Sequence, residues 1–326
     1  MKSDISRRQF LGAIGTYSVA TAVGSVPACA LLTPKPLYPP MDLSYFDTPI
    51  SPAPSDIRIG YASITWDGED LRAIEDIASL GFRGIQLRSN VIQEFGTAAA
   101  VRDLLDKHKL ALVALSSGSV RIDLGVEAEE IARHTAHAKF VQDAGGLYLQ
   151  VTDERPKNRP ITSADYQRLG RLITEIGKRT ADLGIPLGYH NHMGSLGERP
   201  DEVDQILEAA DPRYAKLELD VAHYFQGGGD PAKAIEKYRD RLLFLHIKDV
   251  EKLVPGSASG TKRPYRFVEL GRGQVDLPAV FDALQRVNFR GWAIVELDSV
   301  PDKARTPKES ALISKKYVEE RLGFKV

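Results

Sequence analysis

The stretch PLGYHNHMGSLGERPDEVDQILEAADPRYAKLELDVAH, from Pro186 to His223, contains the repeating unit that decides the fold. It opens with one short apolar run, Pro186–His190, and closes with another, Ala215–Asp220. Between them, Asp201–Ala209 has apolar residues three and four apart, a spacing typical of a helix with one buried face. This order predicts two parallel strands joined by a helical crossover.

The same alternation continues on both sides of this unit from Ile57 onward. Eight strand–helix units over about 270 residues have the size and order of a (β/α)₈ TIM barrel, which is the fold class we predict. The alternative is an open, doubly wound sheet. No Gly-x-Gly-x-x-Gly follows the first strand, so a nucleotide-binding version of that sheet lacks support and no nucleotide cofactor is expected.

The elements of the predicted barrel follow from short apolar runs and amphipathic segments. The predicted strands are Ile57–Ala62, Gly84–Leu87, Ala111–Ser116, Leu147–Val151, Pro186–His190, Ala215–Asp220, Leu243–Lys248 and Trp292–Leu297. The predicted helices are Asp70–Leu80, Thr97–His108, Glu127–Ala144, Ser163–Leu183, Asp201–Ala209, Pro231–Arg239, Leu277–Val287 and a last one near Lys308–Arg321.

Residues 1–30 resemble a twin-arginine signal peptide. Arg7 and Arg8 precede a mild apolar run that is diluted by Gly, Ser and Thr, and this dilution disfavours the alternative of a membrane anchor. Ala28-Cys29-Ala30 fits a cleavage site; lipidation of Cys29 is the alternative, which Pro27 disfavours. We therefore expect a periplasmic or otherwise exported protein that uses the twin-arginine export machinery, and membrane attachment only if Cys29 is lipidated.

Residues 31–56 contain seven prolines, which favours an extended linker ahead of a single barrel domain at 57–326. The formal net charge of -1 provides no general attraction to nucleic acid, and no nucleic-acid partner is expected. A single cysteine excludes an intramolecular disulfide and a cysteine-based metal site.

Four late strands of the predicted barrel end in pairs of ionisable residues. Because strand side chains alternate faces, residues two apart point the same way. If each pair faces the barrel axis, the groups meet at the C-terminal mouth, where such barrels do chemistry. A divalent cation would compensate the carboxylates. The pairs are His190 and His192, Glu218 and Asp220, His246 and Lys248, and Glu296 and Asp298.

Several motifs resemble the xylose isomerase-like TIM-barrel superfamily, which includes sugar phosphate isomerases/epimerases, ketose 3-epimerases and inosose dehydratases. The motifs at His246–Val250 and Gly291–Asp298 are nearest to those of inosose dehydratases. The resemblance covers nearly everything after Ile57. The motifs are Tyr189–Gly194, Leu219–His223, Leu270–Asp276, the His-x-Lys-Asp-Val of His246–Val250 and the Gly-Trp-x-x-x-Glu-x-Asp of Gly291–Asp298.

The resemblance implies one metal ion with a ligand from each of four strands. Asp220, His246 and Glu296 match the superfamily, whereas His190 stands where an acidic residue is common. Two histidines and two carboxylates suit Mn²⁺, Zn²⁺, Co²⁺ or Fe²⁺. A two-glutamate acid/base mechanism therefore does not transfer directly. The alternative for these residues is a polar barrel core satisfied by hydrogen bonds.

The expected proton carriers are His192, Lys248, Glu296 and His223. For Lys248 the alternative is an ion pair with Glu218 or Asp249, and for His223 a helix cap. The expected substrate-binding residues end strands or lie in matched motifs, and ordinary packing is the alternative for the tryptophan. They are Trp66, Arg88, Gln150 and Arg272.

These residues predict a metal-dependent isomerase or epimerase that enolises an unphosphorylated keto-sugar or cyclic polyol. A lyase of the inosose dehydratase or keto-glycoside β-elimination type is the first alternative, and a non-catalytic periplasmic sugar-binding protein is the second. A DNA-repair endonuclease is disfavoured because its metal cluster needs ligands on strands two and three, which here end in Arg88 and Ser116.

Overall fold

The computed structural model describes residues 56–253 and 263–326, and within them eight parallel strands close into a barrel. The strand order around the barrel is β1-β10-β7-β6-β5-β4-β3-β2, which confirms the TIM barrel and excludes an open sheet. The predicted signal peptide, the Pro-rich linker and Cys29 lie outside the described residues. The barrel strands are β1 (Ile57–Ala62), β2 (Gly84–Arg88), β3 (Ala111–Val120), β4 (Tyr148–Asp153), β5 (Leu187–His190), β6 (Ala215–Asp220), β7 (Leu242–Ile247) and β10 (Gly291–Val295).

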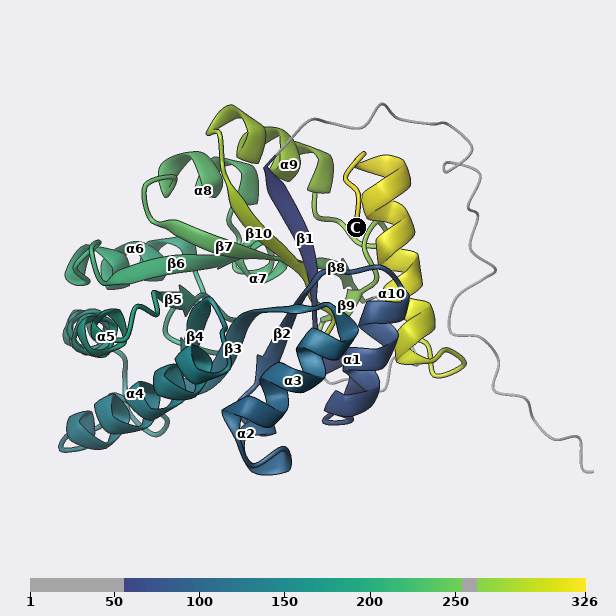
Figure 1. Ribbon diagram of the computed structural model, residues 1–326. Coiled ribbons are helices and arrows are strands. Elements are labelled where there is room, and N and C mark those ends of the chain that lie inside the picture. Colours follow the sequence, from purple (N-terminus) through teal and green to yellow (C-terminus); the bar gives the residue numbers. More distant parts are fainter. Residues whose placement is uncertain (1–55, 254–262) are drawn as a thin grey trace, which may run out of the picture. The chain divides into compact units, whose positions relative to one another are not determined.

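Helices surround the barrel, so the strands are covered on their outer face (Figure 1). Helix α10 lies beside α1 and closes the ring between the last strand and the first. The helices are α1 (Asp70–Ser79), α2 (Val91–Glu94), α3 (Ala98–His108), α4 (Glu127–Asp143), α5 (Ser163–Asp182), α6 (Pro200–Ala209), α7 (Val221–Gln226), α8 (Pro231–Lys237), α9 (Leu277–Arg286) and α10 (Pro307–Lys316), with a 3₁₀ turn η2 (Ser63–Trp66) and a π-helical turn η3 (Tyr317–Arg321).

The hydrophobic core has two parts, one between strands and helices and one inside the barrel. The inner part is a small cluster near the N-terminal ends of the strands, which includes Val113, Phe244 and Trp292. Gly84 has no side chain because the Trp292 ring occupies that space: an added Cβ would lie 2.3 Å from the ring. The bottom of the barrel is therefore filled, and polar groups are confined to the opposite end.

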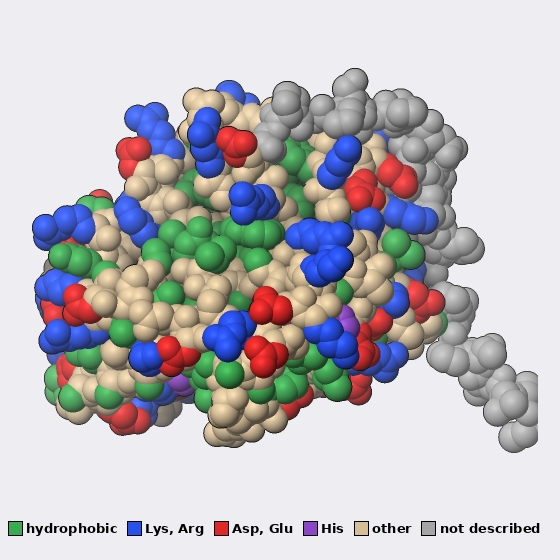
Figure 2. Space-filling view, in the orientation of Figure 1, with side chains coloured by type: hydrophobic (Ala, Val, Ile, Leu, Met, Phe, Trp, Pro, Cys, Tyr) green, Lys and Arg blue, Asp and Glu red, His purple; other side chains and the backbone are tan. Residues whose placement is uncertain are grey.

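The main differences from the predicted elements are an antiparallel hairpin, β8 (Asp249–Lys252) with β9 (Tyr265–Val268), and the short helices α2 and α7. Strand β3 is also longer than predicted, because a register shift between Ser116 and Ser119 lets it continue to Val120. Among the described residues, no helix is both long and apolar enough to cross a membrane. Figure 2 shows positive and negative side chains interspersed over the face turned to the viewer.

Candidate metal and substrate site

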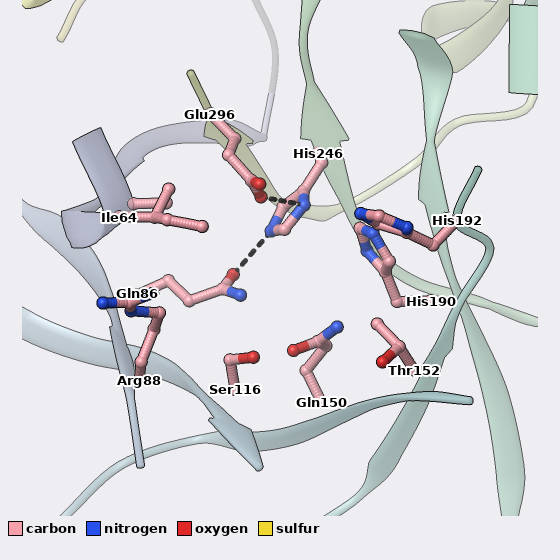
Figure 3. Close-up of a pocket in the computed structure, with 11 residues that line it drawn as sticks. Ile64, Gln86, Arg88, Ser116, Gln150, Thr152, His190, His192, His246 and Glu296 are labelled. Carbon is pink, nitrogen blue, oxygen red and sulfur yellow. Dashed lines mark hydrogen bonds and ion pairs between the residues drawn. The ribbon is translucent and has the colours of Figure 1, made fainter. Parts of the chain in front are cut away.

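The C-terminal ends of β5, β6 and β7 bring His190, Asp220 and His246 together at the mouth of the barrel. All three side chains are buried, and one ligand atom from each lies within 4.8 Å of the others. Glu296 follows β10 and contacts Nδ1 of His246 through its Oε2 atom (Figure 3). The four side chains that the sequence predicts as ligands are therefore gathered at one place.

The two carboxylate oxygens of Asp220 have different roles: one caps a helix, and the other faces the site. Oδ1 accepts hydrogen bonds from the backbone N–H groups of Ala222 and His223, each at 2.8 Å, and so caps helix α7. Oδ2 is buried and has no hydrogen-bond partner in the described part of the chain. It lies 3.6 Å from His246 Nδ1. The cap fixes the carboxylate in the orientation that turns this second oxygen toward the mouth.

His246 is oriented by two acceptors on its other nitrogen. Its Nε2 atom lies 2.8 Å from Gln86 Oε1 and 2.6 Å from Glu218 Oε1. Nε2 faces these two oxygens, whereas Nδ1 faces Asp220 and Glu296, so a cation bound at Nδ1 would leave the ring proton on Nε2. Gln86 was not among the expected site residues, although it lies two residues before Arg88 and shares its face of β2. Glu218, the alternative ion-pair partner of Lys248, contacts the imidazoles of His190 and His246.

Asn191 also has a positioning role that the sequence did not single out. Its fully buried side chain accepts from the backbone N–H of Asp220 at 3.0 Å and donates to the carbonyl of Asp220 at 3.2 Å. This pair of bonds joins the two chain segments just past the last pair of the strands, His190 and Glu218. The ends of β5 and β6, which carry His190 and Asp220, are thereby held together.

The orphaned atoms at this point fit one divalent cation. Five buried atoms of this cluster lack a hydrogen-bond partner among the described residues, namely His190 Nδ1, Asp220 Oδ2, His246 Nδ1 and both carboxylate oxygens of Glu218. Buried polar atoms are nearly always paired, so such a cluster of imidazole nitrogens and carboxylate oxygens indicates a missing partner of positive charge. Two imidazoles and two carboxylates are ligands that Mn²⁺, Zn²⁺, Co²⁺ or Fe²⁺ accept. His190, Asp220, His246 and Glu296 could therefore hold the ion.

A second group of three imidazoles fits a cation less well. His190, His192 and His223 also have ligand atoms within 4.8 Å of one another. However, Nε2 of His223 lies 3.2 Å from the Lys248 ammonium, and its Nδ1 accepts from the backbone N–H of Met193 at 3.1 Å. Both nitrogens of His223 are thus engaged, and an added cation would be repelled by Lys248.

Lys248 is fully buried behind the ligands and does not line the pocket. Its ammonium group contacts Asp298, lies 3.2 Å from Glu296 Oε1 and stacks 4.1 Å above the Phe267 ring. Burial lowers the pKa of Lys248, but Asp298, Glu296 and other nearby carboxylates outweigh this and raise it overall. The ion pair that was the alternative for Lys248 exists, but with Glu296 and Asp298 in place of Glu218 or Asp249.

His192 faces the pocket, whereas His223 is fully buried behind it. Nδ1 of His192 lies 2.7 Å from the carbonyl of Met193, so it carries the proton and Nε2 is left as an acceptor. Burial lowers the pKa of His192 to about 4, with smaller contributions from His190 and Lys248. The imidazole is therefore neutral near pH 7. Of the four expected proton carriers, His192 and Glu296 reach the pocket.

The pocket itself is a cavity of about 100 Å³ at the mouth of the barrel (Figure 3). Its β2–β4 side carries neutral groups and one guanidinium, and the opposite side carries His190, His246 and Glu296. Arg88 and Gln150 line it, as the sequence predicts for substrate-binding residues, and the buried Arg88 Nε and Gln150 Oε1 have no hydrogen-bond partner in the described ranges. Arg88 can therefore donate a hydrogen bond to a polar ligand, and the Gln150 oxygen can accept one.

Trp66 and Arg272, the other two expected substrate contacts, do not line this pocket. The 3₁₀ turn η2 buries the Trp66 ring edge-on against Tyr61, and its indole N–H donates to Asp76 at 3.0 Å. Arg272 lies 3.4 Å from Glu269, whose carboxylate also accepts from Arg305 and Ser310. In both cases a structural partner occupies the polar group that was expected to meet the substrate.

A closed parallel barrel with ionisable side chains gathered at its C-terminal mouth is the architecture of TIM-barrel enzymes. The chain belongs to the xylose isomerase-like TIM barrel family, which matches residues 74–317. It is 26% identical over 300 residues to the inosose dehydratase of Lacticaseibacillus casei, covering 82% of this chain and 98% of that relative. The relatives matched by sequence are enzymes.

Solved structures share the fold at lower sequence identity. The chain is similar to the IolI protein with a bound zinc atom, at a TM-score of 0.68 and 17% identity, over 81% of this chain and 97% of that chain. It is also similar to L-ribulose 3-epimerase, at a TM-score of 0.65 and 17% identity, over 82% and 94% of the two chains.

Proposed function

We propose that this protein is an enzyme that enolises a small, unphosphorylated keto-sugar or cyclic ketone bearing hydroxyls, with isomerisation or epimerisation as the outcome. The observation that carries the proposal is the group of unpartnered ligand atoms of His190, Asp220 and His246, next to a pocket that also contains His192 and Glu296. When bound, a divalent cation supplies Lewis-acid polarisation of a carbonyl oxygen and its neighbouring hydroxyl.

The proposed proton transfers use the two carriers that face the pocket. Nε2 of His192 removes the proton from the carbon next to the substrate carbonyl, and the electron pair of the broken C–H bond passes to the carbonyl oxygen. Return of a proton to the same carbon from the other face re-forms the carbonyl and gives an epimer. Return of a proton to the former carbonyl carbon gives an isomer, because the original carbonyl oxygen then keeps a proton as a hydroxyl, and the hydroxyl on the first carbon gives up its proton and becomes the new carbonyl. Glu296 is the second carrier for this return, and Lys248 and His223 position it and His192.

Elimination is the second candidate, and the inosose dehydratase relatives favour it. The same proton is removed by His192, but the next carbon then loses its hydroxyl with the bonding electron pair. The departing oxygen takes up a proton, so water leaves and a carbon–carbon double bond forms beside the ketone. In either case Arg88 and Gln150 hydrogen-bond the substrate oxygens on the β2–β4 side of the pocket.

The test is deuterium exchange from solvent with a panel of keto-sugars, inososes and 3-keto-glycosides under Mn²⁺, followed by NMR. The proposal predicts exchange at the carbon next to the ketone, lost after chelation and absent in His192→Gln. An epimer or isomer among the products supports the first candidate and an enone supports the second. Ligand binding without exchange would identify a sugar-binding protein, and full activity in chelated protein would contradict the metal.

We also propose that the protein is exported by the twin-arginine route, which the Arg7-Arg8 pair and the following mild apolar run support. Export is the reason to expect an unphosphorylated substrate. Replacing both arginines by lysine in the full chain is expected to leave unprocessed protein in the cytoplasmic fraction. Unchanged processing and fractionation of this variant would contradict the proposal.

A further inference from the structure

The cavity that contains the reacting groups is too small to enclose a whole sugar ring. It measures about 100 Å³. For comparison, an apolar cavity that binds benzene measures about 150 Å³, and a six-membered ring with hydroxyl groups is larger than benzene. A substrate that reaches His246 and Glu296 must therefore extend beyond this cavity.

One route outward lies along the wall formed by β4 and β5. Thr152 and His192 line the cavity and also line a second, larger hollow of about 390 Å³. Figure 3 shows both residues on the same side of the cavity, across from Ile64 and Gln86. We call this hollow the β4–β5 groove; its other lining residues are Ser119, Asp153, Glu154, Arg155, Lys157, Met193, Gly194 and Ser195.

The charged groups of the groove already have partners. Arg155 donates to the carbonyl of Ser195 at 2.7 Å and to Glu202 at 3.2 Å. Asp153 accepts from the Tyr189 hydroxyl at 2.7 Å and from the backbone N–H of Leu196 at 2.6 Å.

The charges at the rim of the groove also offset each other, and the interior of the groove carries hydroxyl groups. Lys157 lies 3.5 Å from Glu154, so these charges offset each other. The side chains left to meet a ligand are Ser119 and Thr152, whose hydroxyls lie 2.9 Å apart and bond to each other. A hydroxyl pair exchanges readily with the hydroxyls of a sugar, and compensated charges give no reason to select an anion.

From these observations, and on the basis of the proposed function, we propose that the β4–β5 groove is a second subsite, which binds a neutral polyhydroxyl moiety linked to the reacting ring. The substrate is then a two-part molecule, such as a keto-glycoside. The link between its parts passes between Thr152 and His192, so the imidazole that faces the reacting ring also borders the second moiety.

The experiment compares a free 3-keto-hexose with a neutral 3-keto-disaccharide as substrates of the metal-loaded, full-length protein. Wild type is expected to favour the disaccharide in kcat/KM. Ser119→Leu fills the groove without touching the cavity, so it should raise KM for the disaccharide by about tenfold or more and leave KM for the free sugar nearly unchanged. Ser79→Leu, on the exposed end of α1, is the matched control and should change neither value.

Each outcome separates this proposal from the proposed function. Equal effects of Ser119→Leu on both substrates, or a wild-type preference for the free sugar, would overturn the second subsite while the enolising activity stands. Absence of turnover with either substrate would overturn the proposed function. A lower KM for a glucuronyl disaccharide than for a glucosyl disaccharide would contradict a subsite for a neutral ligand. If Ser119→Leu does not fold, Ser119→Ala, which removes one hydroxyl, should show the same selectivity at smaller size.

Discussion

At the scale of single residues, two of the four proposed ligands have one polar atom committed to the fold and one turned toward the pocket. Asp220 caps α7 with Oδ1 and presents Oδ2, and His246 bonds Gln86 with Nε2 and presents Nδ1. Such outer partners fix the orientation and the tautomer of a ligand, so their loss weakens metal binding without removing a ligand.

Gln86 and Gln150 give a prediction with a built-in control. Both line the same pocket, but Gln86 contacts His246, whereas Oε1 of Gln150 has no partner among the described residues. Gln86→Leu should weaken metal affinity by about 10- to 100-fold, because the His246 imidazole loses one of the two oxygens that orient it. Gln150→Leu should keep metal affinity and raise KM. Calorimetric metal titration of both variants tests this, and equal metal affinities would contradict it.

The sequence predicts which residues meet better than it predicts what each of them does. Strand periodicity brings His190, Asp220, His246 and Glu296 together without knowledge of side-chain conformations. The roles of Lys248 and Trp66 depend on depth: Lys248 lies behind Glu296, and the η2 turn buries Trp66 against Tyr61. The alternation of side chains along a strand predicts which face a residue occupies. It does not predict how deeply the side chain is buried or which conformation a short turn adopts.

At the scale of elements, the bulge in β3 is held by a hydrogen-bond cluster from helix α4. The buried Ser117 hydroxyl lies 2.6 Å from His134 Nδ1 and 2.7 Å from His137 Nδ1. Neither histidine lines the pocket. Ser116 and Ser119, on either side of the bulge, line the cavity and the groove respectively, so the cluster fixes the spacing between them.

This cluster predicts a pH dependence of stability. Burial, and then Arg133, lower the pKa of His134 to about 4, whereas the unfolded imidazole titrates near its ordinary value of 6.5. The unfolded state therefore binds more protons between these two values, and stability falls as the pH drops through this window. At pH 5 the cost is about 2 kcal/mol relative to pH 7.5.

The measurement is urea unfolding of wild type and His134→Gln at pH 7.5 and pH 5. Glutamine keeps a donor toward Ser117 but does not titrate in this range. The variant should lose about 2 kcal/mol less than wild type between the two values, even if it is less stable at pH 7.5. An equal loss in both proteins would contradict the pKa assigned to His134.

The barrel strands and their helices could be predicted because each is a local pattern. The predicted bounds of β1 and β6 agree with the structure to the residue. The hairpin of β8 and β9 could not be predicted in this way, because Asp249 pairs with Val268 across a long connection and depends on tertiary contacts. Asp249 accepts from the backbone N–H groups of Gly271 and Gly273, contacts that no sequence period reveals.

At the scale of the whole molecule, closure of the barrel depends on the close approach of the Trp292 ring to the backbone of Gly84 at the filled end of the barrel. Gly84→Ala should destabilise the protein by about 1–3 kcal/mol, because the new methyl group overlaps the Trp292 ring. Urea unfolding measures this cost. In a Trp292→Leu background the same substitution should cost less, and equal costs in both backgrounds would show that this contact does not limit barrel closure.

We expect the mouth of the barrel to hold one divalent cation through His190, Asp220, His246 and Glu296. The most direct measurement is the metal content of purified, Mn²⁺- or Zn²⁺-loaded protein by mass spectrometry after dialysis, for wild type, Asp220→Asn and Asp230→Asn. Asparagine keeps the oxygen that caps each helix, and Asp230 caps α8 in the same way far from any ligand. We expect about one ion per chain in wild type and Asp230→Asn and little in Asp220→Asn. Equal metal content in all three proteins, or none in wild type, would contradict it.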